Sequence, residues 1–315
     1  MHEMVNILVT EPEYFEGDAL RILKSIGRVK AKRMGRPELE KEIENTDVLV
    51  VRIETAVDSS LLRKAKRLKV IGSATTGLNH IDTKQAETMD IRIVNLHGMH
   101  TVPTAEHAFA LMLSLCRKIP WAYENMRRGK WERYKFFGMQ LEGKTLGVIG
   151  MGKIGSRVAG YGKAFGMNVV AFDPYVKESV AEMLQLPELL ERSDIVTIHA
   201  MLTKETENMI GYEQLQSMKR TALLINTARE RIVDEDALLK ALSEGAIAGA
   251  AFDVFAKEPA SREDPLLVYA KKNRNLLLTP HIGASTDKAI HDSGVEIANG
   301  VSEELKRMGL LPGKR

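Results

Sequence analysis

The stretch from Lys144 to Asp173, KTLGVIGMGKIGSRVAGYGKAFGMNVVAFD, constrains the fold more than any other part of this chain. A short apolar run over 145–149 leads into the glycine pattern GMGKIG, which predicts a strand, a tight turn and a helix over 153–165. A second apolar run over 168–172 predicts another strand. This strand, helix and strand are typical of a parallel sheet that binds a dinucleotide.

Each glycine of the pattern has its own task in such a unit. Gly150 allows the tight turn, Gly152 lets backbone N–H groups approach a pyrophosphate, and Gly155 packs the helix against the strand. The partial positive charge at the helix N-terminus also favours phosphate. Asp173 ends the second strand, where a carboxylate can accept hydrogen bonds from an adenosine ribose and repel a 2′-phosphate. We therefore expect NAD rather than NADP, and an ordinary glycine-rich turn is the less favoured alternative.

Composition narrows the class of protein. The 315 residues can form two domains, and contents of 44% hydrophobic and 28% charged residues are ordinary for a globular protein. A net charge of +3 is too small to indicate nucleic-acid binding, and no apolar run reaches the roughly 18 residues of a membrane-spanning helix. Cys116, the only cysteine, lies in an apolar stretch and predicts a core thiol. No intrachain disulfide or signal peptide is expected, which favours a reducing, cytoplasmic setting.

The first hundred residues alternate β-branched runs with helical stretches. Strands are predicted over 5–10, 47–52, 68–74 and 91–96, and helices over 17–27 and 58–67. Such alternation predicts an α/β domain whose parallel sheet is covered by helices on both faces. Ligands of these sheets bind beyond the carboxyl ends of the strands, where Arg52 and residues 73–77 would lie.

The alternation resumes after the glycine-rich unit. Strands are predicted over 194–200, 221–228, 246–254 and 276–283, and helices over 235–245 and 286–307. An earlier helix over 104–117 is apolar around most of its circumference, so it needs covering on more than one side. It is either a core helix or part of an interface to which Trp121, Tyr123 and Trp131 contribute.

Three ionisable residues follow strand-like runs of the second half: Arg229 after LLINTA, Glu258 after AAFDVFAK and His281 after LLLTP. Parallel order would bring them to the edge of the sheet where a nicotinamide lies. Histidine suits proton transfer near neutral pH, a carboxylate such as Glu258 would orient its ring, and arginine can bind a carboxylate through two hydrogen bonds. Together they predict hydride transfer between a 2-hydroxy acid and NAD. Taken singly, each could instead be an ordinary surface or loop residue, and His199 is expected to be core or cofactor wall.

With these motifs the chain resembles the D-isomer-specific 2-hydroxyacid dehydrogenases. The likeness rests on GMGKIG with Asp173, INTARERIVDEDAL, AAFDVFAKEP and TPHIGAST, and it extends from about Val5 to Leu305. It implies two α/β domains with doubly wound parallel sheets. A Rossmann NAD domain over 99–285 would be inserted into a flavodoxin-like substrate domain formed by 1–98 and 286–315. It also implies a homodimer.

The same resemblance implies roles for individual residues. His281 would be the acid/base, Glu258 its partner and Arg229 the substrate anchor, with no metal. The expected cofactor-binding residues are Thr76, Gly150, Gly152, Lys153, Ile154, Gly155, Asp173, Ala200, Thr227, Ala228, Asp253, Gly283 and Ala284. The expected substrate-binding residues are Arg52, Thr75, Thr76, Gly77 and Arg133.

The stretch RRGKWERYKFFGMQLEGKTLG (127–147) resembles the phosphoglycerate dehydrogenase branch of the family, in its short form without a C-terminal regulatory domain. Arg52 and Arg133 match basic positions that face the substrate phosphate there. Ser73 and Thr75 depart from that branch, which often has arginine and glycine. The expected substrates are 3-phosphoglycerate and 3-phosphohydroxypyruvate. The alternatives are a glyoxylate or hydroxypyruvate reductase or another D-2-hydroxyacid dehydrogenase and, more remotely, an NAD-sensing protein similar to the C-terminal-binding corepressors.

Overall fold

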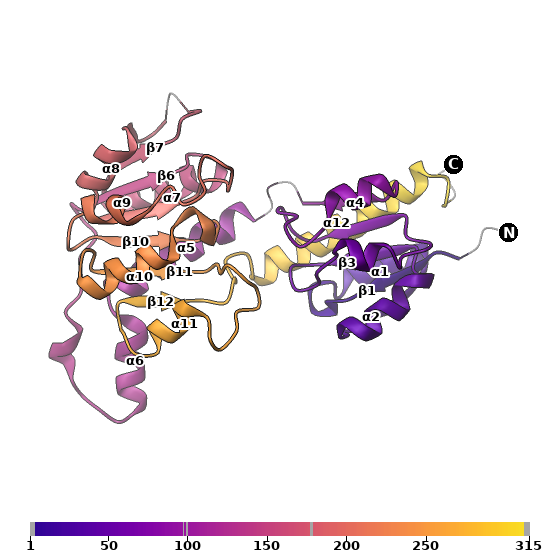
Figure 1. The fold of residues 1–315 in the computed structure, drawn as a ribbon, viewed down its shortest axis with the longest axis horizontal. Helices are drawn as coiled ribbons and strands as arrows, with labels where there is room; N and C mark the ends of the chain where they lie inside the picture. Colours follow the sequence, from indigo (N-terminus) through magenta and orange to yellow (C-terminus); the bar gives the residue numbers. More distant parts are fainter. Residues whose placement is uncertain (1–3, 97, 99, 177–178, 312–315) are drawn as a thin grey trace. The chain divides into compact units, whose positions relative to one another are not determined.

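The computed structural model describes residues 4–96, 98, 100–176 and 179–311. The chain divides into two compact units, Met1–His100 with Ser285–Arg315, and Thr101–Ala284. The corresponding ranges expected from sequence are 1–98 with 286–315, and 99–285. We call them unit 1 and unit 2 and describe each by itself (Figure 1).

Unit 1 contains a five-stranded parallel sheet in the order β2-β1-β3-β4-β5. This is the flavodoxin-like order. The strands are β1 (Asn6–Val9), β2 (Arg28–Ala31), β3 (Val48–Val51), β4 (Val70–Ser73) and β5 (Arg92–Asn95). Its helices are α1 (Asp18–Ile26), α2 (Arg36–Glu42), α3 (Ser59–Leu62), α4 (Thr83–Thr88) and α12 (Asp287–Arg307), with the short 3-10 helices η1 (Pro12–Tyr14) and η2 (Ile43–Asn45).

The two faces of this sheet have separate hydrophobic cores, because neighbouring residues of a strand point to opposite sides. Val50 belongs to one core together with α1 and α12, whereas Leu49 belongs to the other. Helix α12 comes from the far end of the sequence and packs against α1, β4 and β5. Gly72 makes this approach possible, since a Cβ there would lie 2.8 Å from a methyl group of Ile297.

Unit 2 contains a seven-stranded parallel sheet in the order β12-β11-β10-β9-β6-β7-β8. The direction of strand order reverses between β6 and β9, as in a Rossmann fold. The strands are β6 (Thr145–Ile149), β7 (Asn168–Phe172), β8 (Glu182–Met183), β9 (Ile195–Ile198), β10 (Leu223–Asn226), β11 (Gly249–Phe252) and β12 (Leu276–Leu278).

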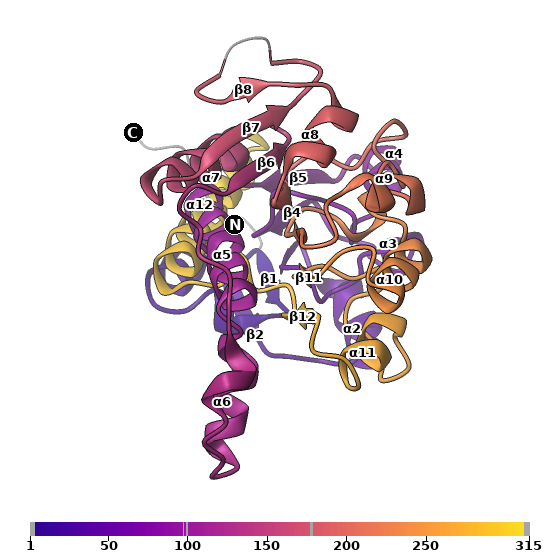
Figure 2. The ribbon, with the colours of Figure 1, turned by 90° about the vertical axis from the view of Figure 1, so that its left-hand side faces the viewer.

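Helices cover both faces of this second sheet (Figure 2). They are α5 (Thr101–Cys116), α6 (Ile119–Arg127), α7 (Lys153–Ala164), α8 (Leu186–Arg192), α9 (Tyr212–Ser217), α10 (Glu235–Glu244) and α11 (Pro265–Ala270), with the 3-10 helices η3 (Arg133–Phe136) and η4 (Glu230–Ile232). The apolar helix expected over 104–117 forms as α5 and packs against α7. Cys116 is buried there, and burial raises the pKa of its thiol to about 11.

Most predicted strands and helices are shorter in the structure, and for two of them the local backbone gives the reason. The helix expected over 58–67 is only α3. After it the N–H groups of Lys64 and Ala65 donate to carbonyls three residues back and that of Lys66 to Lys64 O, so the chain forms tight turns in place of a helix. The strand expected over 276–283 ends at Leu278. Thr279 still donates its N–H to Phe252, but Pro280 has no N–H to give, and His281 turns the chain with a φ of 51°.

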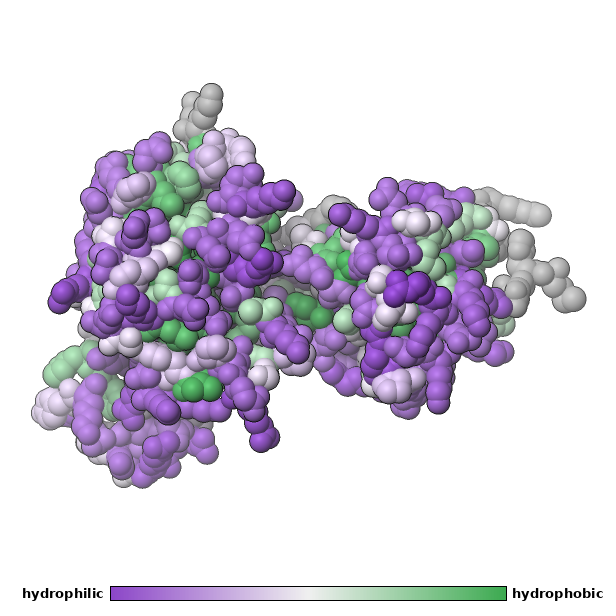
Figure 3. Space-filling model, in the orientation of Figure 1, coloured by the Kyte–Doolittle hydropathy of each residue, from purple (hydrophilic) through white to green (hydrophobic). Residues whose placement is uncertain are grey.

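The surface of both units is largely hydrophilic on the face drawn in Figure 3. Across the described part of the chain, no helix is both long and apolar enough to span a membrane.

Candidate active site

The glycine-rich turn of unit 2 has the close contacts that its sequence predicts. Gly150 has a backbone φ of +91°, which residues other than glycine rarely adopt, and its N–H donates to Phe172 O at 2.8 Å. A Cβ on Gly150 would lie 2.6 Å from the backbone nitrogen of Ala200, so Ala200 borders the turn. A Cβ on Gly155 would lie 1.9 Å from Gly150 O, which shows how closely α7 packs on the turn.

Gly152 is different, because a Cβ built there meets no atom within 4 Å. It is the N-cap of α7, where backbone N–H groups without intrahelical partners begin. In the same unit the Thr227 hydroxyl is buried and has no hydrogen-bond partner among the described residues. An open backbone position at a helix N-terminus and an unsatisfied buried hydroxyl both suit a dinucleotide with a pyrophosphate. Lys153 and Ile154 form the first turn of the same helix.

Asp173 connects this turn to the end of β7. Its carboxylate accepts a hydrogen bond from Met151 N at 2.8 Å and another from Tyr175 N at 2.9 Å. A carboxylate has about four lone-pair positions, so both oxygens can still accept bonds from a ribose. Asp173 therefore also holds the glycine-rich turn, a contact that the motif did not predict.

We expect Asp173→Ala to narrow the preference for NADH over NADPH, because the substitution removes both the ribose acceptor and the negative charge that repels a 2′-phosphate. The ratio of kcat/KM for the two cofactors should fall by at least about tenfold, the effect of one lost charge-assisted hydrogen bond. Steady-state rates with each cofactor measure this. An unchanged ratio would mean that other residues read the ribose.

His281 and Glu258 form a hydrogen-bonded pair in unit 2. The Nδ1 atom of His281 lies 2.6 Å from Glu258 Oε2, and the other carboxylate oxygen accepts from Phe255 N at 3.1 Å. An ionised carboxylate can only accept, so Nδ1 carries a proton and donates it. The second ring nitrogen, Nε2, is therefore the atom that can exchange a proton with a substrate.

Asp253 holds the backbone on which His281 sits. Its carboxylate accepts from Ile282 N at 2.9 Å and from Gly283 N at 2.7 Å, and also from the Thr279 hydroxyl at 2.6 Å. Burial alone would raise the pKa of Asp253, but these bonds and one from His107 outweigh it and lower the pKa. These bonds fix the turn that carries the left-handed His281, a conformation costing on the order of 1 kcal/mol.

His107 and Thr279 are therefore parts of this site that sequence reasoning missed. His107 Nε2 lies 3.2 Å from Asp253 Oδ1 and 3.1 Å from the Thr279 hydroxyl. The only signal for them was position, because Thr279 is the first residue of TPHIGAST and His107 lies on the apolar helix α5. Neither pattern reveals a contact across 172 residues of sequence.

Arg229 follows β10, and its backbone is held by Asn226, another residue that sequence reasoning missed. The buried Asn226 side chain donates to Arg229 O at 2.9 Å and accepts from Ala228 N at 3.0 Å. The guanidinium donates to Ala228 O at 2.7 Å. Burial lowers the pKa of Arg229, and the charge of Glu258 opposes this shift. The cation and the His281–Glu258 pair thus interact electrostatically.

Parallel pairing explains why these residues gather. Strands β10, β11 and β12 are neighbours in the sheet, and Arg229, Glu258 and His281 follow them in that order. His199 follows β9, where its Nε2 lies 2.9 Å from the Thr197 hydroxyl, and burial lowers its pKa to about 3. It remains neutral at pH 7. Within the described residues no group of three or more His, Cys, Asp or Glu side chains could hold a metal ion.

The expected substrate loop of unit 1 is held by a chain of side-chain hydrogen bonds. His80 Nε2 lies 3.1 Å from Ser73 Oγ, which lies 2.8 Å from Thr75 Oγ1. Thr75 donates its only hydroxyl proton to Gly77 O at 2.7 Å. Every contact contains a proton only if Ser73 donates to Thr75 and His80 Nε2–H donates to Ser73. The departures at Ser73 and Thr75 thus form one connected group with His80, while Thr76 is exposed.

Burial lowers the pKa of His80 to about 4, which predicts a pH dependence of stability. The unfolded histidine titrates near 6.5, so between pH 6.5 and 4 the unfolded chain binds more protons. The contribution of neutral His80 to the free energy of unfolding is therefore complete above pH 6.5 and is lost as the pH falls towards 4.

We expect His80→Gln, which cannot titrate, to reduce this acid dependence by about 2–3 kcal/mol. Urea unfolding at pH 7.5 and 4.5 measures it as the change in unfolding free energy between the two pH values. Equal changes in wild type and variant would contradict a neutral His80.

The other two expected substrate residues lie in different units. Arg52 follows β3 in unit 1 and is 8% exposed. Arg133 begins η3 in unit 2 and is exposed, with its guanidinium carbon 5.8 Å from the centre of the Tyr134 ring. Gly283 contacts Asp253, and Ala284 ends unit 2.

Comparison with known proteins bears on this arrangement. Residues 109–283 match the family model described as D-isomer specific 2-hydroxyacid dehydrogenase, NAD binding domain. The D-3-phosphoglycerate dehydrogenase of Methanocaldococcus jannaschii is 42% identical over 96% of this chain and 58% of its own length. The chain thus spans little more than half of that relative.

Two further similarities extend over nearly complete chains. The hydroxypyruvate reductase of Thermotoga maritima is 36% identical over 94% of this chain and 97% of its own. The structure of the Aquifex aeolicus D-lactate dehydrogenase complexed with NAD and lactic acid superposes with a TM-score of 0.81. It is 29% identical and covers 96% of both chains.

Proposed function

Because this chain belongs to the D-isomer specific 2-hydroxyacid dehydrogenase family, we propose that it is an NAD-dependent oxidoreductase that interconverts a D-2-hydroxy acid and its 2-oxo acid. The observation that carries the proposal is the 2.6 Å contact between His281 and Glu258, in the same unit as Arg229 and the glycine-rich turn. In this proposal Arg229, Glu258 and His281 are the catalytic residues.

The chain's own residues account for the proton and for substrate orientation. In the oxidation, Nε2 of His281 takes the hydroxyl proton, and Glu258 stabilises the resulting imidazolium through Nδ1. In the reduction, the same atom returns the proton to the carbonyl oxygen. The Arg229 guanidinium binds the substrate carboxylate and holds the carbon beside it in place. NAD bound at the glycine-rich turn would supply the hydride acceptor.

We further propose 3-phosphoglycerate and 3-phosphohydroxypyruvate as the substrates. The support comes from Arg52, a cation without a carboxylate partner among the described residues, and from the similarity to the M. jannaschii relative. The similarity to the T. maritima relative, together with Ser73 and Thr75, favours a hydroxypyruvate or glyoxylate reductase as the second candidate.

A panel of 2-oxo acids with NADH distinguishes the two candidates. We expect kcat/KM for phosphohydroxypyruvate to exceed that for hydroxypyruvate and glyoxylate by at least about tenfold, which corresponds to one charge-assisted contact. Equal kcat/KM values would contradict a preference for the phosphorylated substrate and leave the hydroxypyruvate or glyoxylate reductase as the remaining candidate. Turnover of none of them, with NADH still bound, would favour an NAD-sensing protein.

We also propose a homodimer in a reducing, cytoplasmic compartment. Large apolar side chains on α6 and the segment after it are exposed, among them Trp131 at 76%, Tyr134 at 75% and Phe137 at 73%. Figure 2 shows α6 extending away from the sheet of unit 2. An exposed aromatic surface of this kind suits a second copy of the chain.

We expect Trp131→Glu to shift the protein from dimer towards monomer, because a buried charge would oppose association. Sedimentation equilibrium measures this shift. A wild-type monomer at micromolar concentration would contradict the proposal.

A further inference from the structure

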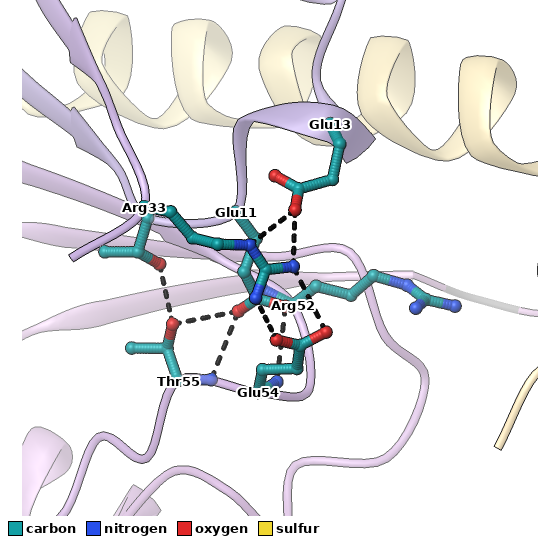
Figure 4. A network of polar contacts seen from close by, with 7 residues as sticks. Glu11, Glu13, Arg33, Arg52, Glu54 and Thr55 are labelled. Carbon is teal, nitrogen blue, oxygen red and sulfur yellow. Dashed lines mark hydrogen bonds and ion pairs between the residues drawn. The ribbon is translucent and has the colours of Figure 1, made fainter. Parts of the chain in front are cut away.

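We propose that Glu11 is a positioning residue whose buried carboxylate holds the loop Arg52–Thr55, so that the Arg52 guanidinium is presented to the anionic end of the substrate. This inference rests on the proposed function and concerns a residue to which neither the sequence motifs nor the family resemblance assigns a task. It is carried by contacts within unit 1 (Figure 4).

Glu11 is only 1% exposed and directly follows the turn at the end of β1. Its Oε1 accepts from Arg52 N at 3.0 Å, from Thr55 N at 3.1 Å and from the Thr55 hydroxyl at 2.9 Å. Its Oε2 accepts from Glu54 N at 3.2 Å. A carboxylate this deeply buried is costly to keep ionised unless hydrogen bonds compensate for the lost water. Here three backbone N–H groups of one loop provide that compensation.

The same short turn also holds the other end of Arg52. Tyr14 ends η1, three residues after Glu11, and its ring centre lies 4.1 Å from the Arg52 guanidinium carbon. Ser285, the first residue of the second segment of unit 1, has its hydroxyl oxygen 3.4 Å from Arg52 Nη2. Glu11 therefore fixes the backbone of Arg52, and Tyr14 supports its side chain. An arginine stacked on a ring in this way keeps its planar donors available for an anion.

A second arginine keeps the neighbouring carboxylates away from Arg52. Arg33 pairs with Glu13 and with Glu54, and its Nε lies 2.6 Å from Glu13 Oε1. Figure 4 shows the Arg52 side chain running away from this group. No carboxylate among the described residues lies within ion-pair distance of the Arg52 guanidinium, so none of them compensates its charge. This is the charge balance of an anion site.

Glu11→Gln tests the proposal, because glutamine keeps the shape but replaces one acceptor oxygen with an NH2 group and removes the charge. We expect KM for phosphohydroxypyruvate to rise about tenfold, the effect of one weakened hydrogen bond to a charged group, with kcat changed less than about twofold. KM for hydroxypyruvate, which lacks the phosphate, should stay the same. The matched control is Glu13→Gln, which removes the same charge from a residue bonded to Arg33 and should leave both KM values unchanged.

A double-mutant cycle with Arg52→Ala separates this inference from the proposed function. If Glu11 acts through Arg52, adding Glu11→Gln to Arg52→Ala has no further effect on KM for phosphohydroxypyruvate. Full additivity, or an equal loss with both substrates, overturns the inference. An Arg52→Ala variant that retains the wild-type KM values overturns the proposed phosphate contact, and the role of Glu11 falls with it.

Thr55→Val provides a milder variant in case Glu11→Gln does not fold. It removes one hydrogen bond to the same carboxylate and should raise KM for phosphohydroxypyruvate about threefold, as expected for a neutral donor. Thermal melting establishes that each variant is folded. A folded Thr55→Val protein with the wild-type KM counts against the proposal.

Discussion

His281→Ala is expected to lower kcat by a factor of about 10² to 10⁴, the usual contribution of a positioned general acid or base. The physical reason is that Nε2 of His281 is the proton-exchanging atom, since Nδ1 is occupied by Glu258 at 2.6 Å. Alanine leaves only water to carry the proton. Single-turnover rates with saturating NADH measure the chemical step directly.

NADH binding should survive this substitution, because none of the contacts of the glycine-rich turn involves His281. Fluorescence titration with NADH checks this. The matched control is His291→Ala, which removes an exposed histidine of α12 that pairs with Asp18 and Asp292. Loss of NADH affinity with an intact chemical step would show that the role assigned to His281 is wrong.

Arg229→Lys is expected to lower kcat/KM about 100-fold, the scale of a misplaced substrate. Lysine keeps the positive charge but offers a single point of contact in place of a planar fork. The Arg229 guanidinium donates to Ala228 O at 2.7 Å and has further N–H groups left for a carboxylate. A lysine ammonium cannot make that bond and also bind a carboxylate through two parallel hydrogen bonds. Steady-state kinetics with the best 2-oxo acid of the panel provides the measurement.

Arg231→Lys is the matched control for Arg229. It lies two residues further along the chain, is exposed and pairs with Glu207. The same exchange there should change kcat/KM by less than about twofold, because surface ion pairs contribute little. Near-normal activity of Arg229→Lys would remove Arg229 from the site.

Local patterns predicted the fold class well. The predicted family and the two parallel α/β sheets are confirmed, as is an NAD binding domain, by the match over 109–283 and by the strand orders. These features can be read from sequence because buried parallel strands appear as short β-branched runs and because a dinucleotide turn needs glycine at particular positions. Strand β2 was not predicted, since its residues are mostly exposed and carry no apolar run.

Sequence reasoning about the site was limited by distance along the chain. It could identify Arg229, Glu258 and His281 because each comes within a few residues after a strand-like run, and their roles stay a proposal. It could not find Asp253 as the residue that fixes the turn of His281, although it named Asp253 as a cofactor contact. Residues 253 and 283 are 30 positions apart, and no periodic pattern encodes their 2.7 Å hydrogen bond.

The sequence by itself therefore determined the family, the alternation of strands and helices, the glycine-rich turn and the candidates for chemistry. Only the tertiary structure decided how those candidates are held. Glu258 bonds to Nδ1 of His281, Asp253 accepts from the backbone of Gly283 in the turn after His281, and Glu11 accepts from the backbone of Arg52. The reason is physical. Strands and turns follow from neighbouring residues, whereas a buried carboxylate is satisfied by N–H groups that only the folded chain brings within reach.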